Sequence, residues 1–129
     1  MENTALNTTL FENLGKVFYA IANADRNLHE NEIARLKAEI EKYWKPIFAE
    51  APYSMAYYIW HAFERCRSNK VAADKAFEEF ALYFEQEPGP FTAEIRELIL
   101  DTANAIAAAY ADKNKSELIL LAKLQLLLK

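Results

Sequence analysis

Apolar residues recur at intervals of three or four positions along most of this chain. The first such run begins near Leu10, and the last one ends at Leu128. Side chains with this spacing share one face of an α-helix, whereas a half-buried strand needs strict alternation. Only 2 of the 129 residues are glycine and 4 are proline, which leaves few positions for tight hairpin turns. The sequence therefore predicts an all-α fold without a sheet.

Prolines and short polar stretches divide the helical pattern into segments. The expected helices cover about residues 8–24, 30–47, 52–66, 69–86, 92–110 and 117–128. The third of them is apolar on two sides, which indicates a place in the middle of the bundle. A chain of 129 residues can bury a substantial core as one domain. We therefore expect a single-domain bundle of about six helices, with roughly five to seven as the range.

The first and last helical pairs of the prediction repeat one another. A shift of 85 residues places Leu10 on Ile95, and the apolar pattern continues without a gap. The aspartates of the two connecting loops match only if two residues are inserted before the second loop and two are removed after it. The pattern predicts a pseudo-twofold pair of helix–loop–helix units, at about residues 8–45 and 92–128, with two helices between them.

Charge and cysteine content narrow the class of protein. The formal net charge is −4 at pH 7, whereas proteins that bind nucleic acid through its phosphates usually carry a basic surface. Cys66 has no partner for an internal disulfide, and the first residues do not resemble a signal peptide. The longest uncharged run, residues 51–63, is shorter than the ~20 apolar residues of a membrane-spanning helix. We expect a cytoplasmic protein that neither binds nucleic acid nor crosses a membrane.

A polar, acidic loop joins the first two expected helices. Residues 22–25 read Ala-Asn-Ala-Asp, and Glu32 follows seven positions after the aspartate. Residues 111–117 hold a weaker copy, with an aspartate in its second position and a glutamate in its last. Carboxylate and amide oxygens at this density could bind a divalent cation such as Ca²⁺, Mg²⁺, Mn²⁺ or Zn²⁺. The candidate metal ligands are Asp25, Glu32, Asp112 and Glu117.

The same loop has an interpretation that needs no metal. Asp25 can accept hydrogen bonds from backbone N–H groups at the start of the second helix. Glu32 can close a capping box, because it lies three residues after His29, which can serve as the N-cap. The loop is not an EF-hand, since Glu30 and Leu36 occupy the positions of its glycine and its bidentate carboxylate. The sequence leaves both interpretations open.

The two loop patterns together are similar to those of the TerB-like tellurite-resistance family. In that family an Ala-Asp-Gly motif, a short acidic loop and a Glu that opens an amphipathic helix usually occur twice in one all-helical domain. Residues 22–32 and 111–117 match the order and helical setting, with Arg26 and Lys113 in place of the glycines. The resemblance covers nearly the whole chain, residues 1–129. It implies a scaffold or sensor linked to stress responses, metals or protein contacts rather than an enzyme.

The last expected helix carries more leucine than one buried face can hold. A short helix can bury every side only at the centre of a bundle, and several exposed leucines would form an apolar patch of the kind that marks an interface. The residues concerned are Leu118, Leu120, Leu121, Leu124, Leu126, Leu127 and Leu128. The sequence predicts either a central helix or a surface for a homodimer or another protein partner.

Nothing in the sequence indicates a catalytic site. His61 and Glu64 lie one helical turn apart, but a di-iron centre needs more histidine and glutamate than this pair. Cys66 lacks the second cysteine of a Cys-x-x-Cys motif, and the aromatic residues between 53 and 84 are expected to pack the core. We therefore expect a non-enzymatic interaction or stress-response module. The alternative is a protein that binds or senses a divalent cation through the two acidic loops.

Overall fold

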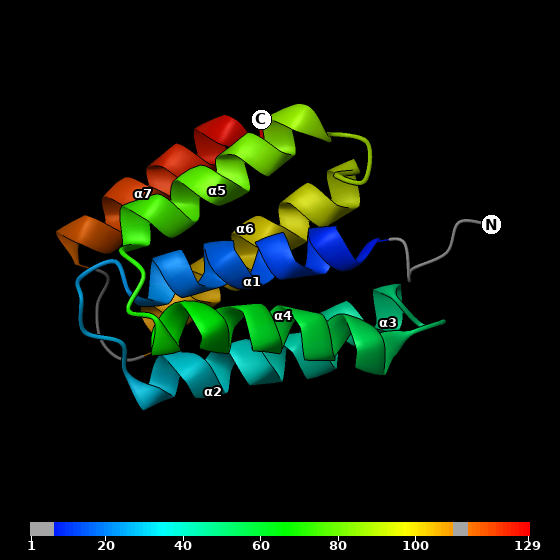
Figure 1. The fold of residues 1–129 in the computed structure, drawn as a ribbon, viewed down its shortest axis with the longest axis horizontal. Helices are drawn as coiled ribbons and strands as arrows, with labels where there is room; N and C mark the ends of the chain where they lie inside the picture. The colour runs from blue at the N-terminus through cyan, green and yellow to red at the C-terminus, as the bar shows by residue number, and fades with distance from the viewer. Residues whose placement is uncertain (1–6, 110–113) are drawn as a thin grey trace.

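The computed structural model describes residues 7–109 and 114–129, which form a bundle of helices without strands (Figure 1). The elements are α1 (Thr8–Ala22), α2 (Glu30–Glu39), the π-helical segment η2 (Ile40–Trp44), α3 (Lys45–Ile47), α4 (Pro52–Ser68), α5 (Ala73–Gln86), α6 (Ala93–Ala108) and α7 (Lys115–Leu127). Apart from η2 and the three-residue α3, these are six helices of ten or more residues within the described ranges. The prediction of an all-α bundle of about six helices is confirmed. None of the described helices has the length and apolar character needed to cross a membrane.

One helix begins later than the sequence predicts. The helix expected from residue 69 begins at Ala73, because α4 continues to Ser68 and a turn follows it. Lys70 in this turn has a left-handed backbone with a φ of 53°. A residue in this conformation cannot continue an α-helix, so it separates α4 from α5.

The first helix, α1, is at the centre of the bundle. It packs against α4 on one side and against α5 and α6 on the other, as Figure 1 shows, and it also contacts α2 and α7. The prediction that the helix over residues 52–66 is central is wrong. That helix, α4, leaves Tyr53 and Tyr57 78% and 58% exposed. Tyrosine carries a hydroxyl group that solvent can hydrate, so its ring need not be buried as a phenylalanine ring would be.

A glycine explains how closely α1 approaches α4. A Cβ atom at Gly15 would lie 2.3 Å from the carbonyl oxygen of Ile59 and 2.9 Å from the Cβ atom of Ala62. Any larger residue would therefore push the two helices apart. The absence of a side chain at this position allows the tightest contact of the central helix.

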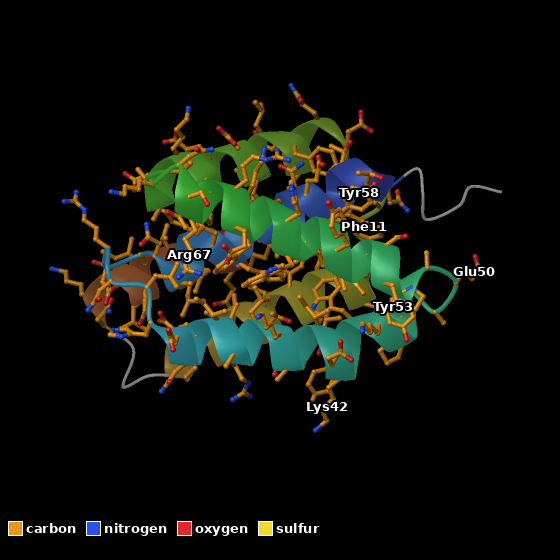
Figure 2. The ribbon with its side chains drawn as sticks, turned by 60° about the horizontal axis from the view of Figure 1, so that its bottom comes forward. Phe11, Lys42, Glu50, Tyr53, Tyr58 and Arg67 are labelled. Atoms are coloured by element: carbon orange, nitrogen blue, oxygen red, sulfur yellow. The ribbon has the colours of Figure 1, made fainter. Side chains whose placement is uncertain are left out.

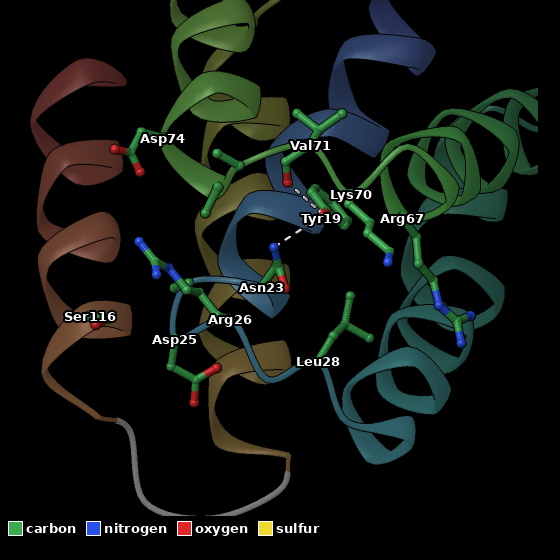
Figure 3. Close-up of a pocket in the computed structure, with 13 residues that line it drawn as sticks. Tyr19, Asn23, Asp25, Arg26, Leu28, Arg67, Lys70, Val71, Asp74 and Ser116 are labelled. Atoms are coloured by element: carbon green, nitrogen blue, oxygen red, sulfur yellow. Dashed lines mark hydrogen bonds between the residues drawn. The ribbon is translucent and has the colours of Figure 1, made fainter.

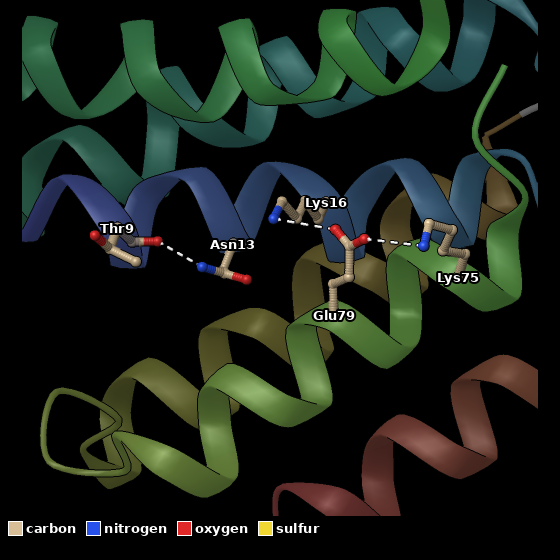
Figure 4. Close-up of polar contacts among 5 residues, drawn as sticks. All are labelled: Thr9, Asn13, Lys16, Lys75 and Glu79. Carbon is tan, nitrogen blue, oxygen red and sulfur yellow. Dashed lines mark hydrogen bonds and ion pairs between the residues drawn. The ribbon is translucent and has the colours of Figure 1, made fainter. Parts of the chain in front are cut away.

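One ion pair on the other side of α1 joins that helix to α5. The Nζ atom of Lys16 lies 3.1 Å from Oε1 of Glu79, and within α5 the Nζ atom of Lys75 lies 3.7 Å from Oε2 of the same glutamate (Figure 4). Within α1, Nδ2 of Asn13 donates a hydrogen bond of 2.8 Å to the Thr9 carbonyl oxygen. Both ion pairs are partly exposed, so they add little to the stability of the fold.

Aromatic side chains fill the core between the helices. Trp44 is fully buried, and its ring centroid lies 5.9 Å from that of Phe18. The indole Nε1 of Trp44 donates a hydrogen bond of 2.9 Å to the hydroxyl oxygen of Thr102, which satisfies both buried groups. Figure 2 shows Phe11 inside the bundle and Lys42 extending away from η2 into solvent.

Candidate functional site

The two acidic loops predicted as candidate sites meet at one end of the bundle. Asp25 lies just after α1, and Asn114 lies just before α7. The Nδ2 atom of Asn114 donates a hydrogen bond of 2.7 Å to Oδ2 of Asp25, although 89 residues separate them. The Oδ1 atom of Asp25 accepts a second bond, of 3.0 Å, from the backbone N–H of Asn27. Asp25 therefore closes its own loop and ties it to the second loop.

Each loop ends in a capping box that uses a predicted site residue. The backbone N–H of His29 donates a hydrogen bond of 2.9 Å to Oε1 of Glu32 at the start of α2. The backbone N–H of Asn114 donates one of 3.2 Å to Oε1 of Glu117, and Oδ1 of Asn114 accepts one of 2.9 Å from the Glu117 N–H. The capping role predicted for Glu32 is confirmed, and Glu117 has the same role in the second unit.

The two capping glutamates are buried against each other. Glu32 is 2% exposed and Glu117 is 3% exposed, and their carboxyl groups are close enough for Glu117 to raise the pKa of Glu32. A negative charge beside a buried carboxyl group favours its protonated form. We call Glu32 and Glu117 the glutamate pair.

The surroundings of the glutamate pair favour the protonated form. The pKa of Glu32 is raised from 4.5 to about 8, with burial as the largest cause and the contact with Glu117 and its negative charge as further causes. The charge of Asp25 raises the pKa further, while the hydrogen bond from the His29 backbone opposes the shift. Glu32 therefore keeps a proton near neutral pH, where an exposed glutamate would have lost it.

The predicted metal ligands come together only in part. Asp25, Glu32 and Glu117 gather where the two loops meet, whereas Asp112 lies outside the described residues. Within the described part of the chain, no group of three or more His, Cys, Asp or Glu side chains is placed to hold a metal ion. In this arrangement the carboxyl groups bind backbone amides, Asn114 and one another.

The other residues considered for chemistry have structural contacts. Nδ1 of His61 lies 3.3 Å from an Arg65 guanidinium nitrogen, and its ring stacks on that of Tyr57. Glu64 forms an ion pair of 3.1 Å with Arg67. Burial raises the pKa of the Cys66 thiol, which keeps it protonated and lowers its reactivity.

The residue that connects the two loops, Asn114, is not among the site residues predicted from the sequence. Asn114 exchanges hydrogen bonds with Glu117 at the start of α7 and donates one to Asp25. The signal was present in the sequence, because Asn114 and Glu117 have the Asn-x-x-Glu spacing of a capping box. Only the packing of the two units, however, brings Asn114 to Asp25.

Comparison of the chain with protein-family models, with curated proteins and with solved structures finds no match. The TerB-like resemblance therefore stays a prediction that rests on the two loop motifs.

Proposed function

We propose that this protein is a non-enzymatic, cytoplasmic interaction module of the TerB-like type, and that the solvent-facing side of α7 is its contact surface. The observation that supports this proposal is the distribution of apolar residues around α7. Leu120, Leu121, Leu124 and Leu128 are buried in the bundle. On the opposite side Leu118, Ile119 and Leu126 are 51%, 47% and 68% exposed.

The exposed residues form a row along the helix. Leu118 and Ile119 are adjacent, and Ala122 and Leu126 follow at intervals of three or four positions; we call this row the outer α7 face. Single exposed apolar residues are ordinary on a protein surface, whereas a continuous row is typical of an interaction site. The shape of the surface, one helix with an apolar row, is suited to a second helix packed against it.

Charge indicates the kind of helix that fits the outer α7 face. Lys115 and Lys123 are exposed on α7 and Lys129 just after it, while the only carboxylate side chain of α7, Glu117, is buried on the other side. A partner helix with exposed leucine and acidic side chains would complement both the apolar row and the lysines.

The chain itself carries such a helix. On the solvent side of α5, Glu78 and Glu85 are exposed beside Leu82, which is 54% exposed. We call these three residues the outer α5 face. Helices α5 and α7 lie near each other in Figure 1, and their first turns line one pocket through Asp74 and Ser116. A two-fold axis along the helices would place α7 of each copy on α5 of the other, so the proposed partner is a second copy of the chain.

Self-association measured by sedimentation equilibrium tests the proposal. We expect the wild-type chain to form dimers and a Leu118→Glu/Leu126→Glu variant to be monomeric, because each glutamate would place a charge in the apolar contact. Tyr53→Glu is the matched control, since Tyr53 is exposed on α4 and lies in neither outer face. A wild-type chain that stays monomeric at high concentration, or a variant that still forms dimers, would contradict the proposal.

The glutamate pair supports a second function, which is binding of a divalent cation. The buried carboxyl groups of Glu32 and Glu117, with the charge of Asp25 acting on Glu32, would offer oxygen ligands to a cation once Glu32 has lost its proton. Binding would then strengthen as the pH rises, because the cation competes with the proton.

Thermal unfolding with Ca²⁺, Mg²⁺, Mn²⁺ or Zn²⁺ tests this second function. A cation held only by the folded state raises the unfolding midpoint. We expect an increase for the wild-type chain and none for Asp25→Asn/Glu32→Gln. Glu30→Gln, which removes an exposed carboxylate from the same helix, should respond as the wild type does. An equal response of all three proteins, or no response to any cation, would exclude the glutamate pair as the binding site.

A further inference from the structure

A pocket of about 740 Å³ lies between the loop that follows α1, the end of α4 and the start of α5. Its lining includes three basic side chains, Arg26, Arg67 and Lys70, which come from three separate segments. In Figure 3, Asn23 and Leu28 lie between Arg26 on one side and Lys70 and Arg67 on the other. The pocket is therefore basic on two sides, in a chain whose net charge is −4.

The backbone conformation at two of these basic residues is unusual. Arg26 and Lys70 have φ values of 64° and 53°, and they are the only described residues other than glycine with positive φ. Glycine or asparagine is the ordinary choice in this conformation, because a longer side chain raises the conformational energy. Both strained positions of the described chain thus carry a cation, and both line the same pocket.

Among the described residues, neither Arg26 nor Lys70 forms an ion pair. Arg67, in contrast, pairs with Glu64. Two aspartates also line the pocket. Asp25 has both oxygens engaged, by Asn27 and Asn114, and Asp74 lies on the Arg26 side of the pocket, apart from Lys70 and Arg67, in Figure 3.

The floor of the pocket is polar, and two hydrogen bonds hold its side chains in place. The hydroxyl of Tyr19 donates a hydrogen bond of 2.7 Å to the Val71 carbonyl oxygen, and Nδ2 of Asn23 donates one of 3.1 Å to the Tyr19 oxygen (Figure 3). Burial raises the pKa of Tyr19, so its hydroxyl stays neutral. Next to this floor, α5 begins at Ala73 without a side chain that caps its first N–H groups. Free N–H groups at a helix start favour a negatively charged ligand.

We propose that this pocket binds a small molecule that carries a phosphate group. Guanidinium groups bind phosphate oxygens through paired hydrogen bonds, and an ammonium group adds a point charge. The volume exceeds that of inorganic phosphate and lies in the range of pockets for small molecules or cofactors. Cations on both sides of the pocket suit a ligand with several anionic oxygens, and the side chain of Leu28 offers an apolar contact. This pocket contains no residue of the outer α7 face and neither glutamate of the glutamate pair, although Asp25 borders both the pocket and that pair.

Titrations with pyrophosphate and with inorganic phosphate, followed by ¹H–¹⁵N NMR of the full chain, test the proposal. We expect saturable shifts at the amides of residues 70–74 and at the Nε–H groups of Arg26 and Arg67, with pyrophosphate bound more tightly than phosphate. Each lost charge-assisted hydrogen bond should weaken pyrophosphate binding about tenfold.

Arg26→Gly and Lys70→Gly are the decisive variants. Glycine suits the positive φ at both positions, so each variant should fold at least as stably as the wild type while it binds pyrophosphate about tenfold more weakly. Lys42→Gln, which removes an exposed lysine on η2, should bind like the wild type. Equal affinity of the glycine variants and the wild type would overturn the proposal, as would shifts spread over all exposed lysines without saturation. Binding of phosphate and pyrophosphate with equal affinity would indicate a general anion contact and would also overturn it.

Discussion

The carboxyl groups of Glu32 and Glu117 lie beside each other inside the bundle, although each one also caps its own helix. This contact joins the start of α2 to the start of α7. The first and last helical units are therefore connected at a buried pair of acidic side chains, of which Glu32 has a raised pKa. Several measurable properties of the protein depend on this pair and on the packing around it.

The first prediction concerns pH. Because the pKa of Glu32 is about 8 in the folded state and 4.5 in an exposed glutamate, the folded state binds more protons than the unfolded state between these pH values. The contribution of Glu32 to the free energy of unfolding is therefore fully present below about pH 4.5 and is lost as the pH rises toward 8. Urea unfolding at several pH values measures this decline.

The matched variant for the pH prediction is Glu32→Gln. Glutamine can keep the bond to the His29 N–H and cannot ionise, so the difference in stability between variant and wild type should shift in favour of the variant as the pH rises. A difference that stays constant from acidic to mildly alkaline pH would mean that Glu32 does not titrate as described.

The second prediction concerns the contact between α1 and α4. Gly15→Ala should lower the free energy of unfolding by about 1–3 kcal/mol or more, because the new methyl group would overlap the carbonyl oxygen of Ile59. Gly89→Ala is the control, since no atom lies within 4 Å of the Cβ position there. Chemical denaturation of both variants measures the difference, and equal stability would show that the helices can separate at little cost.

The third prediction concerns the buried bond between Trp44 and Thr102. Trp44→Phe removes the indole donor and leaves the Thr102 hydroxyl without its partner, which should cost about 1–3 kcal/mol of stability. Thr102→Val removes the acceptor in the same way. In a double-mutant cycle, the sum of the stability losses of the two single variants should exceed the stability loss of the double variant. A sum equal to the loss of the double variant would contradict a direct interaction.

The fourth prediction concerns Asn114. Asn114→Ala removes the cap of α7 and the bond to Asp25, so it should cost about 1–2 kcal/mol, more than Thr92→Ala at the start of α6. Thr92 provides one cap bond and no contact with a distant loop in the described chain. Thermal unfolding of the two variants compares them, and a smaller loss for Asn114 would indicate that the link between the loops contributes nothing.

The sequence was sufficient for the fold class and for part of the candidate site. Apolar spacing predicted the helices because each buries one face, and the position of Glu32 after His29 predicted its capping role. Apolar spacing did not predict which helix is central. Tyr53 and Tyr57 count as apolar in a periodic pattern, yet their hydroxyl groups make exposure acceptable, and α1 is central partly because Gly15 admits α4 so closely.

The contacts between distant segments also lay beyond the sequence pattern. The contact between Glu32 and Glu117 and the hydrogen bond between Asp25 and Asn114 exist only because the two units pack side by side. The sequence also did not predict the left-handed conformation of Arg26 and Lys70, since both residue types ordinarily have negative φ. The sequence predicted where the loops lie, and the packing of the two units determined which contacts the loops form.

The most direct test of the proposed interaction surface is a charge exchange between its two halves, measured as the dimer dissociation constant by sedimentation equilibrium. Lys123→Glu on α7 and Glu78→Lys on α5 should each weaken the dimer, because each places like charges opposite one another. The double variant Lys123→Glu/Glu78→Lys should recover much of the wild-type affinity, since the opposite charges then face each other again. A double variant that associates no better than either single variant, or a wild-type chain that does not dimerise, would contradict the account.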